Sequence, residues 1–298
     1  MSKKIIVLAS VMLVSLLCLG DGHAGTVRIG VLAKNGPEKA LKKWKATGDY
    51  LTSRLNGDTF EIVPLGFDAV YPAIEKGQVD FFLVNSSMFV TAKKKYGARA
   101  ILTMINSRQG KALKSFGGVI FTLIDNDKVN TLADVKGKTF AAVKETSFGG
   151  WQMAYKVFRD AGIDPYKDFA SVTFSGKHIN VVDAVFNEAI EVGTVRTDTL
   201  ERLAAVGAVS MEDFKILNKQ DHKDFPFVCS TALYPEWPLA KLAKTDDALA
   251  RKVADALKGM EQGDPAAKAA KILGWTDPLD YAPVENLQKT LKIGAFAQ

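Results

Sequence analysis

The residues best suited to chemistry lie in the turn Thr146–Gly150, where two hydroxyl side chains are followed by Phe148 and two glycines. The apolar run 139–143 before this turn predicts a strand, and the amphipathic run 150–161 after it predicts a helix. A helix N-terminus presents free backbone N–H groups and a positive dipole end, so it can bind a small anion without a metal. The alternative is that the hydroxyl groups only cap the helix. The candidate ligand contacts in this turn are Thr146, Ser147, Phe148 and Gly149.

A second turn of the same type lies earlier in the chain. Asn85, Ser86 and Ser87 follow a predicted strand at 80–84 and open a predicted helix over 86–96. Each turn taken alone is typical of an ordinary helix cap. Two such turns facing each other would clamp an oxyanion from both sides, so these three residues are candidate ligand contacts as well.

Ionisable side chains stand at three further strand ends. His178 closes the loop Ser175–His178, where its imidazole could donate to a bound oxygen; the alternative is a capping or surface histidine. The forked donors of Arg196 suit an oxyanion, and the alternative is a structural ion pair with a carboxylate. Either Asp198 or Thr197 is a candidate N-cap of the next helix, and Asp198 is also a candidate ligand contact. Lys34, after the first strand, is either an additional charge in the site or a solvated lysine.

The sequence carries no strong signature of an enzyme. The motifs G-x-S-x-G and G-x-x-x-x-G-K-[ST] are absent, and no nucleophile–base–acid set stands out. A hydrolase would need His178 to activate Ser147 or Ser175, an alternative that spacing alone leaves open. No spacing of His, Cys and carboxylates predicts a metal site. We therefore expect a non-catalytic protein that uses neither a metal nor a cofactor.

Residues 1–24 have the features of a cleaved export signal. Lys3 and Lys4 precede the apolar run 5–20, and Gly22-His23-Ala24 supplies small residues for cleavage. The apolar run is shorter than the roughly 20 residues that span a bilayer, so a retained anchor is the less favoured alternative. We expect an exported, periplasmic protein.

Composition is that of a globular protein, with 47% hydrophobic and 24% charged residues and a formal net charge of +6. The positive surplus is spread along the chain without interleaved aromatic residues, so it suits an anionic ligand and does not predict nucleic-acid binding. Loss of Cys18 with the signal would leave Cys229 alone and exclude an intrachain disulfide. Cys229 lies in an apolar extended run, which favours a buried thiol over a reactive one.

Strand-like and helix-like segments alternate along most of the chain. The predicted strands are 27–32, 60–65, 80–84, 99–105, 116–124, 139–143, 171–174 and 191–195, and two more extended runs are predicted at 215–217 and 225–233. The predicted helices between them are 38–55, 68–76, 86–96, 150–161, 180–188 and 198–206, and the stretch from Trp237 onward is predicted to be helical. Apolar strands separated by helices predict an α/β protein with parallel sheets covered on both faces.

The polar stretch 106–115 separates two such α/β units, which predicts two lobes with a ligand cleft between them. We expect residues 25–110 and 225–298 in lobe 1 and residues 111–224 in lobe 2. The two hinge segments are expected at Asn106–Ser115 and His222–Phe227. In open α/β sheets ligands bind beyond the C-terminal ends of strands, and the candidate turns lie there.

Together these features resemble the phosphonate-binding-protein-like family of extracytoplasmic solute-binding proteins. The resemblance rests on the opening strand Val27–Leu32, the segment Gly77–Phe81 before the Asn85–Ser87 turn, and the Thr146–Gly150 loop. His178 falls where that family has a ligand-contacting histidine. The resemblance implies the type II periplasmic binding fold, with two lobes that close over a phosphonate, phosphite, phosphate ester or related oxyanion. It also implies delivery of the ligand to an ABC permease.

Four motifs are similar to the extracytoplasmic sensor domain of tetrathionate-type histidine kinases: Phe116–Phe121, Ser147–Gly150, Gly193–Asp198 and Tyr234–Pro238. This similarity implies, as the alternative, a free-standing sensory protein that presents a sulfur oxyanion such as tetrathionate to a membrane histidine kinase. Phe148 stands in a loop that has more hydroxyl groups in phosphonate binders, so a sulfur oxyanion is as arguable as a phosphonate. In either case we expect a monomer.

Overall fold

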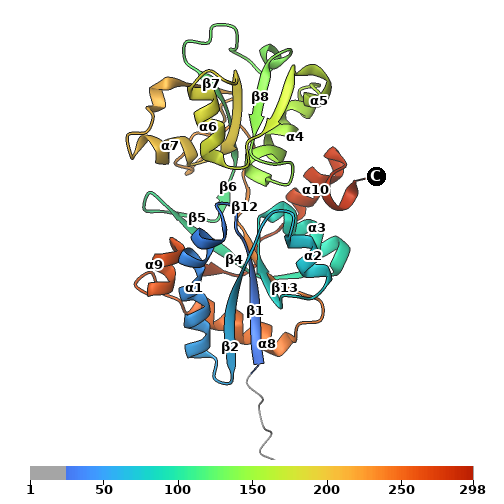
Figure 1. The fold of residues 1–298 in the computed structure, drawn as a ribbon, viewed down its shortest axis with the longest axis vertical. Coiled ribbons are helices and arrows are strands. Elements are labelled where there is room, and N and C mark those ends of the chain that lie inside the picture. The colour runs from blue at the N-terminus through green and yellow to red at the C-terminus, as the bar shows by residue number, and fades with distance from the viewer. Residues whose placement is uncertain (1–24, 298) are drawn as a thin grey trace, which may run out of the picture.

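The alternating segments fold into two α/β units stacked end to end, joined by a narrow connection (Figure 1). The computed structural model describes residues 25–297. The export signal predicted for residues 1–24, with Cys18, lies outside the described residues. In the range 25–297, none of the helices has the length and apolar character needed to cross a bilayer.

The first sheet combines strands from both ends of the described chain. Its order is β14-β4-β13-β3-β1-β2, with β5 paired to β4 outside this path. β1 pairs in parallel with β2 and with β3. The strands of this sheet are β1 (Gly25–Leu32), β2 (Asp58–Leu65), β3 (Phe81–Leu83), β4 (Arg99–Arg108), β5 (Lys111–Leu113), β13 (Pro238–Lys241) and β14 (Ile272–Thr276).

The prediction of an all-helical stretch from Trp237 onward is wrong, because this stretch contains β13 and β14. Both strands run antiparallel to β4, and β13 is also antiparallel to β3, so the sheet is mixed rather than parallel. β13 has only four residues and all are buried, so its sequence shows no alternation of apolar and polar residues that would predict a strand. Its Lys241 is buried because the ammonium donates to the Thr245 carbonyl and pairs with Asp247.

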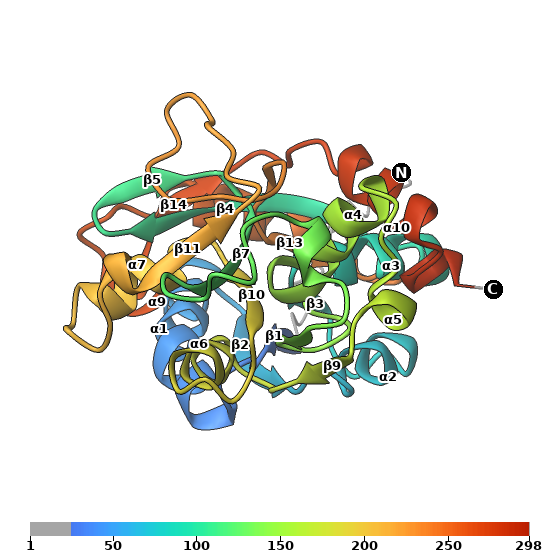
Figure 2. The ribbon, with the colours of Figure 1, turned by 90° about the horizontal axis from the view of Figure 1, so that it is seen from above.

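Helices cover the first sheet on both sides. α1 and α9 lie on one side, and α2 and α3 lie on the other (Figures 1 and 2). α10 packs on α3 and also reaches α4 of the second unit. The helices of this unit are α1 (Pro37–Arg54), α2 (Val70–Glu75), α3 (Ser86–Tyr96), α8 (Asp247–Lys258), α9 (Pro265–Ala270) and α10 (Ala282–Leu291).

The second sheet has the order β11-β7-β10-β8-β9. β8 pairs in parallel with β9 and β10, whereas β7 is antiparallel to β10 and β11. Its strands are β7 (Gly118–Leu123), β8 (Thr139–Ala142), β9 (Ser171–Phe174), β10 (Val192–Arg196) and β11 (Phe214–Leu217). Its α-helices are α4 (Met153–Asp160), α5 (Pro165–Asp168), α6 (His178–Phe186) and α7 (Thr199–Ala204). The predicted α/β class is confirmed.

The two units are joined where β6 (Ser115–Phe116) pairs antiparallel with β12 (Tyr234–Pro235). Before β12 the chain still follows the second sheet, because the Ser230 N–H donates to the Gly118 carbonyl at 2.8 Å. The return crossing, the segment in which the chain passes back from the second unit to the first, therefore lies later than the expected hinge at His222–Phe227. Two-residue strands carry no periodic signal that a sequence could show. The division into lobes at 110/111 and 224/225 stays a prediction.

Candidate functional site

The turn after β8 does not start an ordinary α-helix. Phe148–Gln152 form a π-helical turn that leads directly into α4, and Ser147 precedes it without capping it through its side chain. Both glycines are needed for close packing. A Cβ at Gly150 would lie 2.5 Å from Val143 Cγ2, and one at Gly149 would lie 2.9 Å from the Phe116 ring. The turn is thereby fixed, and the Ser147 hydroxyl is not used as a cap.

A small cavity of about 20 Å³ lies between the two units at this turn. Its volume is enough for about one water molecule. Both units contribute to its wall, and the lining residues are Leu32, Lys34, Phe67, Asn85, Phe116, Val143, Ser147, Phe148, Gly149, Lys177, His178, Arg196 and Trp237. The ends of strands from both sheets thus meet at one site.

The sequence-predicted residues separate into two groups. Six of them line the cavity: Asn85, Ser147, Phe148, Gly149, His178 and Arg196. The other four lie behind its wall: Ser86, Ser87, Thr146 and Asp198. Helical geometry explains part of this division, because consecutive residues at a helix start point in different directions.

Ser86 and Ser87 have structural partners away from the cavity. The Ser86 hydroxyl donates to the Pro235 carbonyl at 2.6 Å, so it holds the return crossing. Ser87 Oγ accepts from Gln288 Nε2 at 2.7 Å, which ties α3 to α10. Both serines are almost completely buried.

Asn85 connects the two turns directly. Its Oδ1 accepts from the Met88 N–H at 2.9 Å and so caps α3, while its Nδ2 donates to the Thr146 carbonyl at 3.1 Å. The two turns therefore face each other across the units, joined by an amide. The Thr146 hydroxyl is buried without a hydrogen-bond partner among the described residues.

His178 presents a neutral N–H donor to the cavity. Its Nδ1 accepts from the Arg196 backbone N–H at 3.2 Å, so the imidazole proton resides on Nε2. Burial, together with the positive charges of Lys34 and Arg196, holds the pKa of His178 well below its usual range. The ring therefore stays neutral at physiological pH and can donate from Nε2.

Lys34 contributes positive charge to the cavity wall; the sequence had left open whether it would lie in the site or be a solvated lysine. Its ammonium lies 5.2 Å from the centre of the Trp237 ring and has no carboxylate partner within residues 25–297. Burial and the charges of Arg196 and Arg108 hold the pKa of Lys34 well below its usual range. A bound anion would relieve both effects.

Sequence reasoning assigned no ligand role to the six other lining residues, which are Leu32, Phe67, Phe116, Val143, Lys177 and Trp237. Trp237 had one signal, its place in the Tyr234–Pro238 motif. Lys177 lies in the loop Ser175–His178, where only His178 was considered, and Phe67 lies in a loop with no chemical pattern around it.

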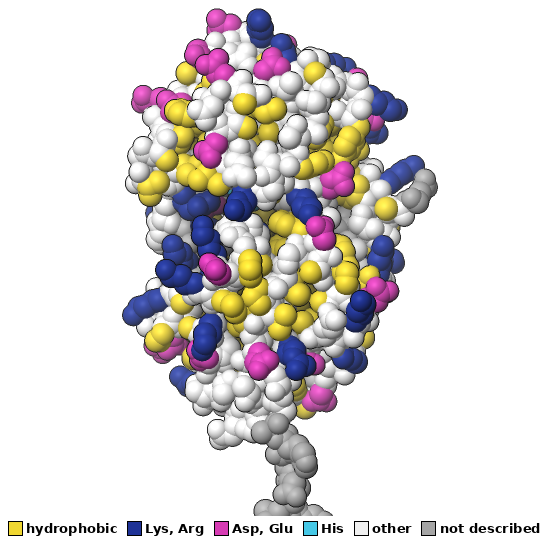
Figure 3. All heavy atoms as spheres, viewed as in Figure 1, with side chains coloured by type: hydrophobic (Ala, Val, Ile, Leu, Met, Phe, Trp, Pro, Cys, Tyr) yellow, Lys and Arg dark blue, Asp and Glu magenta, His cyan; other side chains and the backbone are white. Residues whose placement is uncertain are grey.

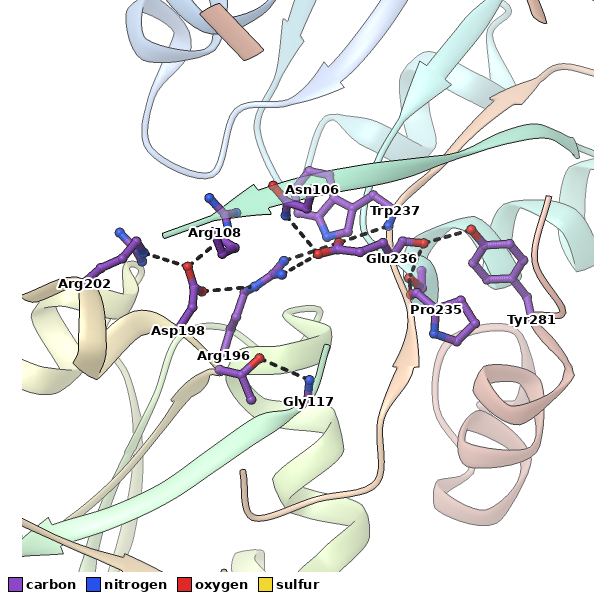
Figure 4. A network of polar contacts seen from close by, with 12 residues as sticks. Asn106, Arg108, Gly117, Arg196, Asp198, Arg202, Pro235, Glu236, Trp237 and Tyr281 are labelled. Atoms are coloured by element: carbon purple, nitrogen blue, oxygen red, sulfur yellow. Dashed lines mark hydrogen bonds and ion pairs between the residues drawn. The ribbon is translucent and has the colours of Figure 1, made fainter. Parts of the chain in front are cut away.

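Arg196 forms ion pairs with carboxylates, which was the alternative to ligand binding that the sequence left open. Its Nη2 lies 2.5 Å from Glu236 Oε1 and its Nε lies 3.5 Å from Asp198 Oδ1 (Figure 4). The guanidinium also stacks on Phe116, 4.2 Å from the ring centre. Burial raises the pKa of Glu236, but Arg196, Arg108 and Asn106 outweigh it and hold that pKa below its usual range. Arg196 thus borders the cavity with its charge already compensated.

Asp198 receives three guanidinium groups. Its Oδ2 pairs with Arg108 Nε at 3.0 Å and with Arg202 Nε at 2.9 Å, while Oδ1 faces Arg196 (Figure 4). Its backbone is left-handed, with φ at 72°, and its side chain does not cap α7. Asp198 thus occupies the expected N-cap position of α7, but its carboxylate forms ion pairs and does not accept a hydrogen bond from the helix backbone. The Arg108 pair joins β4 to the second unit.

Cys229 is buried and is the free cysteine of the described chain. Its thiol donates to the Thr231 carbonyl at 3.2 Å, and burial raises its pKa. These features fit a structural thiol. Within residues 25–297, no group of three or more His, Cys, Asp or Glu side chains is placed to hold a metal ion.

The sequence of this chain is similar to those of known proteins. The sequence of residues 29–284 matches the family model described as ABC transporter, phosphonate, periplasmic substrate-binding protein. A curated relative, the tetrathionate sensor histidine kinase TtrS of Salmonella typhimurium, is 32% identical over 292 residues, covering 97% of this chain and 47% of the relative. The chain thus spans about half the length of that relative.

Two solved structures have the same fold at low sequence identity. PhnD1 of Prochlorococcus marinus, in complex with methylphosphonate, has a TM-score of 0.71 and 15% identity over 90% of this chain and 98% of its own. A binding protein component of a phosphonate ABC transporter from Pseudomonas aeruginosa has a TM-score of 0.70 and 16% identity over 90% of this chain and 86% of its own. They confirm the expected type II periplasmic binding fold. With the family match, they lead to one conclusion: the chain belongs to the family of periplasmic substrate-binding proteins of phosphonate ABC transporters.

Proposed function

We propose that this protein binds a small oxyanion between its lobes, at the cavity that has room for about one water molecule in this structure and would widen as the lobes separate, and delivers the anion to an ABC permease. The observation that carries the proposal is the set of donors in that cavity. The Lys34 ammonium, the His178 Nε2–H and the Ser147 hydroxyl line one small space and have no acceptor among the described residues. An oxyanion supplies the acceptors that these groups lack, and it compensates a positive charge that burial disfavours.

Binding in this proposal needs domain closure and no covalent step. Lys34 belongs to the first unit, and Ser147 and His178 belong to the second, so an anion held by all three stabilises the closed arrangement. The Asn85–Thr146 hydrogen bond and the Lys144–Asp68 ion pair, with Nζ and Oδ2 2.6 Å apart, also join the units. The ligand then acts by shifting the population from open to closed forms.

Isothermal titration tests the proposal. Phosphate, methylphosphonate, sulfate, thiosulfate and tetrathionate are titrated into the wild type and into Lys34→Gln. Loss of a charge-assisted hydrogen bond costs about 1.5–3 kcal/mol, so Lys34→Gln is expected to weaken binding about tenfold or more. Lys45→Gln, on the exposed Lys45–Asp49 pair of α1, is the control for loss of one positive charge. The proposal fails if none of the five anions binds the wild type.

The second candidate is a sensory protein whose ligand-bound form docks on a membrane histidine kinase. The similarity to the tetrathionate sensor kinase over 97% of this chain favours it. Both functions share the ligand site, so only the partner separates them. Deletion of the gene would abolish growth on methylphosphonate as the phosphorus source in the first case. In the second case it would abolish a transcriptional response to tetrathionate and leave growth unchanged.

A hydrolase built on Ser147 and His178 finds no support in this geometry. Nδ1 of His178 already accepts from the Arg196 N–H, and Nε2 carries the proton, so neither nitrogen is free to take a proton from a serine. Turnover of a chromogenic phosphate or sulfate ester that vanishes in Ser147→Ala would contradict the proposal of a non-catalytic protein.

A further inference from the structure

A second and much larger hollow opens beside the cavity. Its volume is about 620 Å³, within the range of sites that hold small organic ligands. It lies between α1 and α9 of the first unit and reaches Arg202 of α7 in the second. Lys and Arg side chains gather at the waist of the molecule on this side (Figure 3). We call this hollow the outer pocket.

The outer pocket is lined by nine basic side chains and by no carboxylate: Lys34, Lys39, Lys42, Lys43, Arg108, Arg196, Arg202, Lys268 and Lys271. The three arginines share the nearby carboxylates of Asp198 and Glu236. None of the six lysines forms an ion pair within residues 25–297. Positive charges concentrated in a concave site with low-dielectric walls create a strong local potential for an anion.

Part of this charge is shielded from solvent: Lys34, Lys43 and Arg108 are half-buried and Arg196 is buried, whereas the other five basic residues are exposed. Burial and the neighbouring Arg108 lower the pKa of Lys43 to about 7, against the opposite effect of Glu236. The Lys43 ammonium lies 5.0 Å from the centre of the Trp44 ring, and Met104 lies in the same wall. The pocket therefore combines cations with an apolar surface, as a site for an organic anion requires.

The outer pocket adjoins the cavity of the proposed function. The two share four lining residues: Leu32, Lys34, Arg196 and Trp237. Lys34 is the lysine common to both walls, and its ammonium lies over the Trp237 ring. Lys34 therefore lies at the boundary between the two spaces.

We propose that the outer pocket is a second anion subsite, and that the preferred ligand carries two anionic groups joined by a short chain. The first group occupies the cavity at Lys34, His178 and Ser147, and the second is bound by Lys43 and Lys271 in the outer pocket. The inference rests on the proposed oxyanion site for the first group. Phosphonate and sulfonate end groups share the required chemistry, so both are tested.

The test compares ligands with one and two anionic groups. Methylphosphonate and methanesulfonate are the probes with one group, and propane diphosphonate and propane disulfonate are the probes with two. Each is titrated into the wild type and into the double variant Lys43→Gln/Lys271→Asn. Asparagine suits Lys271 because its φ is 51°, in the left-handed region. Lys45→Gln, on the same helix as Lys43 but paired outside the pocket with Asp49, is the matched control.

We expect at least one probe with two groups to bind the wild type about tenfold more tightly than its counterpart with one group. The double variant is expected to remove that advantage and to change the affinity for the probes with one group by less than about twofold. The advantage should also shrink as salt is added, because the lysines are partly solvated. Thermal unfolding of the double variant checks that it is folded.

The outcomes separate this inference from the proposed function. Equal affinity of the wild type for both kinds of probe, or equal weakening of both by the double variant, overturns the second subsite and leaves the oxyanion site standing. If no probe with one group binds but a probe with two binds in a Lys43-dependent manner, the outer pocket is supported and the cavity is not. Absence of binding by every probe overturns both.

Discussion

Arg196, at the end of β10 in the second unit, donates from Nη2 to Oε1 of Glu236, directly after β12, over 2.5 Å. Both side chains are buried, and Asn106 Nδ2 donates to the same Oε1 at 2.8 Å. The pair therefore fastens the second sheet to the return crossing at the edge of the cavity. The pair also occupies the Arg196 guanidinium group, which had been predicted from the sequence to bind the ligand.

Glu236→Gln is expected to lower the free energy of unfolding by about 3 kcal/mol or more, because removing one partner of a buried pair leaves the other charge uncompensated. Urea unfolding followed by circular dichroism measures the change. Asp49→Asn, which breaks the exposed pair with Lys45, is the control and should cost less than about 1 kcal/mol. Equal effects of the two substitutions would contradict a structural role of Glu236.

Gly150→Ala is expected to destabilise the protein by about 1–3 kcal/mol, because the new Cβ would meet Val143 Cγ2 at 2.5 Å and Ser147 Oγ at 2.7 Å. It should also weaken oxyanion binding, since the contact displaces Ser147. Gly263→Ala is the matched control, because nothing lies within 4 Å of the Cβ position there. Thermal unfolding and titration calorimetry measure both effects, and an unchanged Gly150→Ala protein would disprove the packing argument.

His178 is expected to remain neutral, with its proton on Nε2, from about pH 6 to about pH 8, because burial and nearby cations lower its pKa. Nitrogen-15 NMR of the imidazole distinguishes the two tautomers and the charged form directly. His178→Ala should weaken oxyanion binding about tenfold, from loss of one hydrogen bond to a charged group. A charged imidazole near pH 6, or an Nδ1–H tautomer, would overturn the assignment.

Lys43→Met is expected to stabilise the protein near pH 7 and below. Burial lowers the folded-state pKa of Lys43 to about 7 from 10.5, with Arg108, Arg196 and Lys271 adding to the effect and Glu236 opposing it. The unfolded state therefore binds more protons between these values, and the penalty that Lys43 imposes disappears as pH rises through this window. The difference in unfolding free energy between variant and wild type should fall toward zero near pH ~10.5. A difference that does not change with pH would show that Lys43 stays charged throughout.

Cys229 is expected to resist iodoacetamide in the folded protein, because its thiol is buried and burial raises its pKa. Mass spectrometry before and after addition of urea measures the labelling. Cys229→Ser should leave the affinity for thiosulfate and tetrathionate unchanged. Rapid labelling of the native protein, or loss of affinity in the variant, would give the thiol a functional role.

Most of the fold could be predicted because its signals are local. β9 was predicted with its observed limits, and α3 also begins and ends where the sequence indicated. β13 and β14 were missed for the opposite reason: their pairing with β4 joins segments more than a hundred residues apart, and short buried strands have no period of their own. The π-helical turn at Phe148 likewise depends on packing against Phe116 and Tyr234.

Periodicity, caps and motifs are properties of neighbouring residues, so they were enough to predict the α/β class, the family resemblance and the strand-end turns in which the cavity lies. Which side chains of those turns face the cavity depends instead on contacts between segments that are distant in the chain. Ser86 and Ser87 were drawn into hydrogen bonds with Pro235 and Gln288, and Arg196 into its pair with Glu236. Lys34 was left without a partner carboxylate, since charge compensation depends on contacts between distant segments.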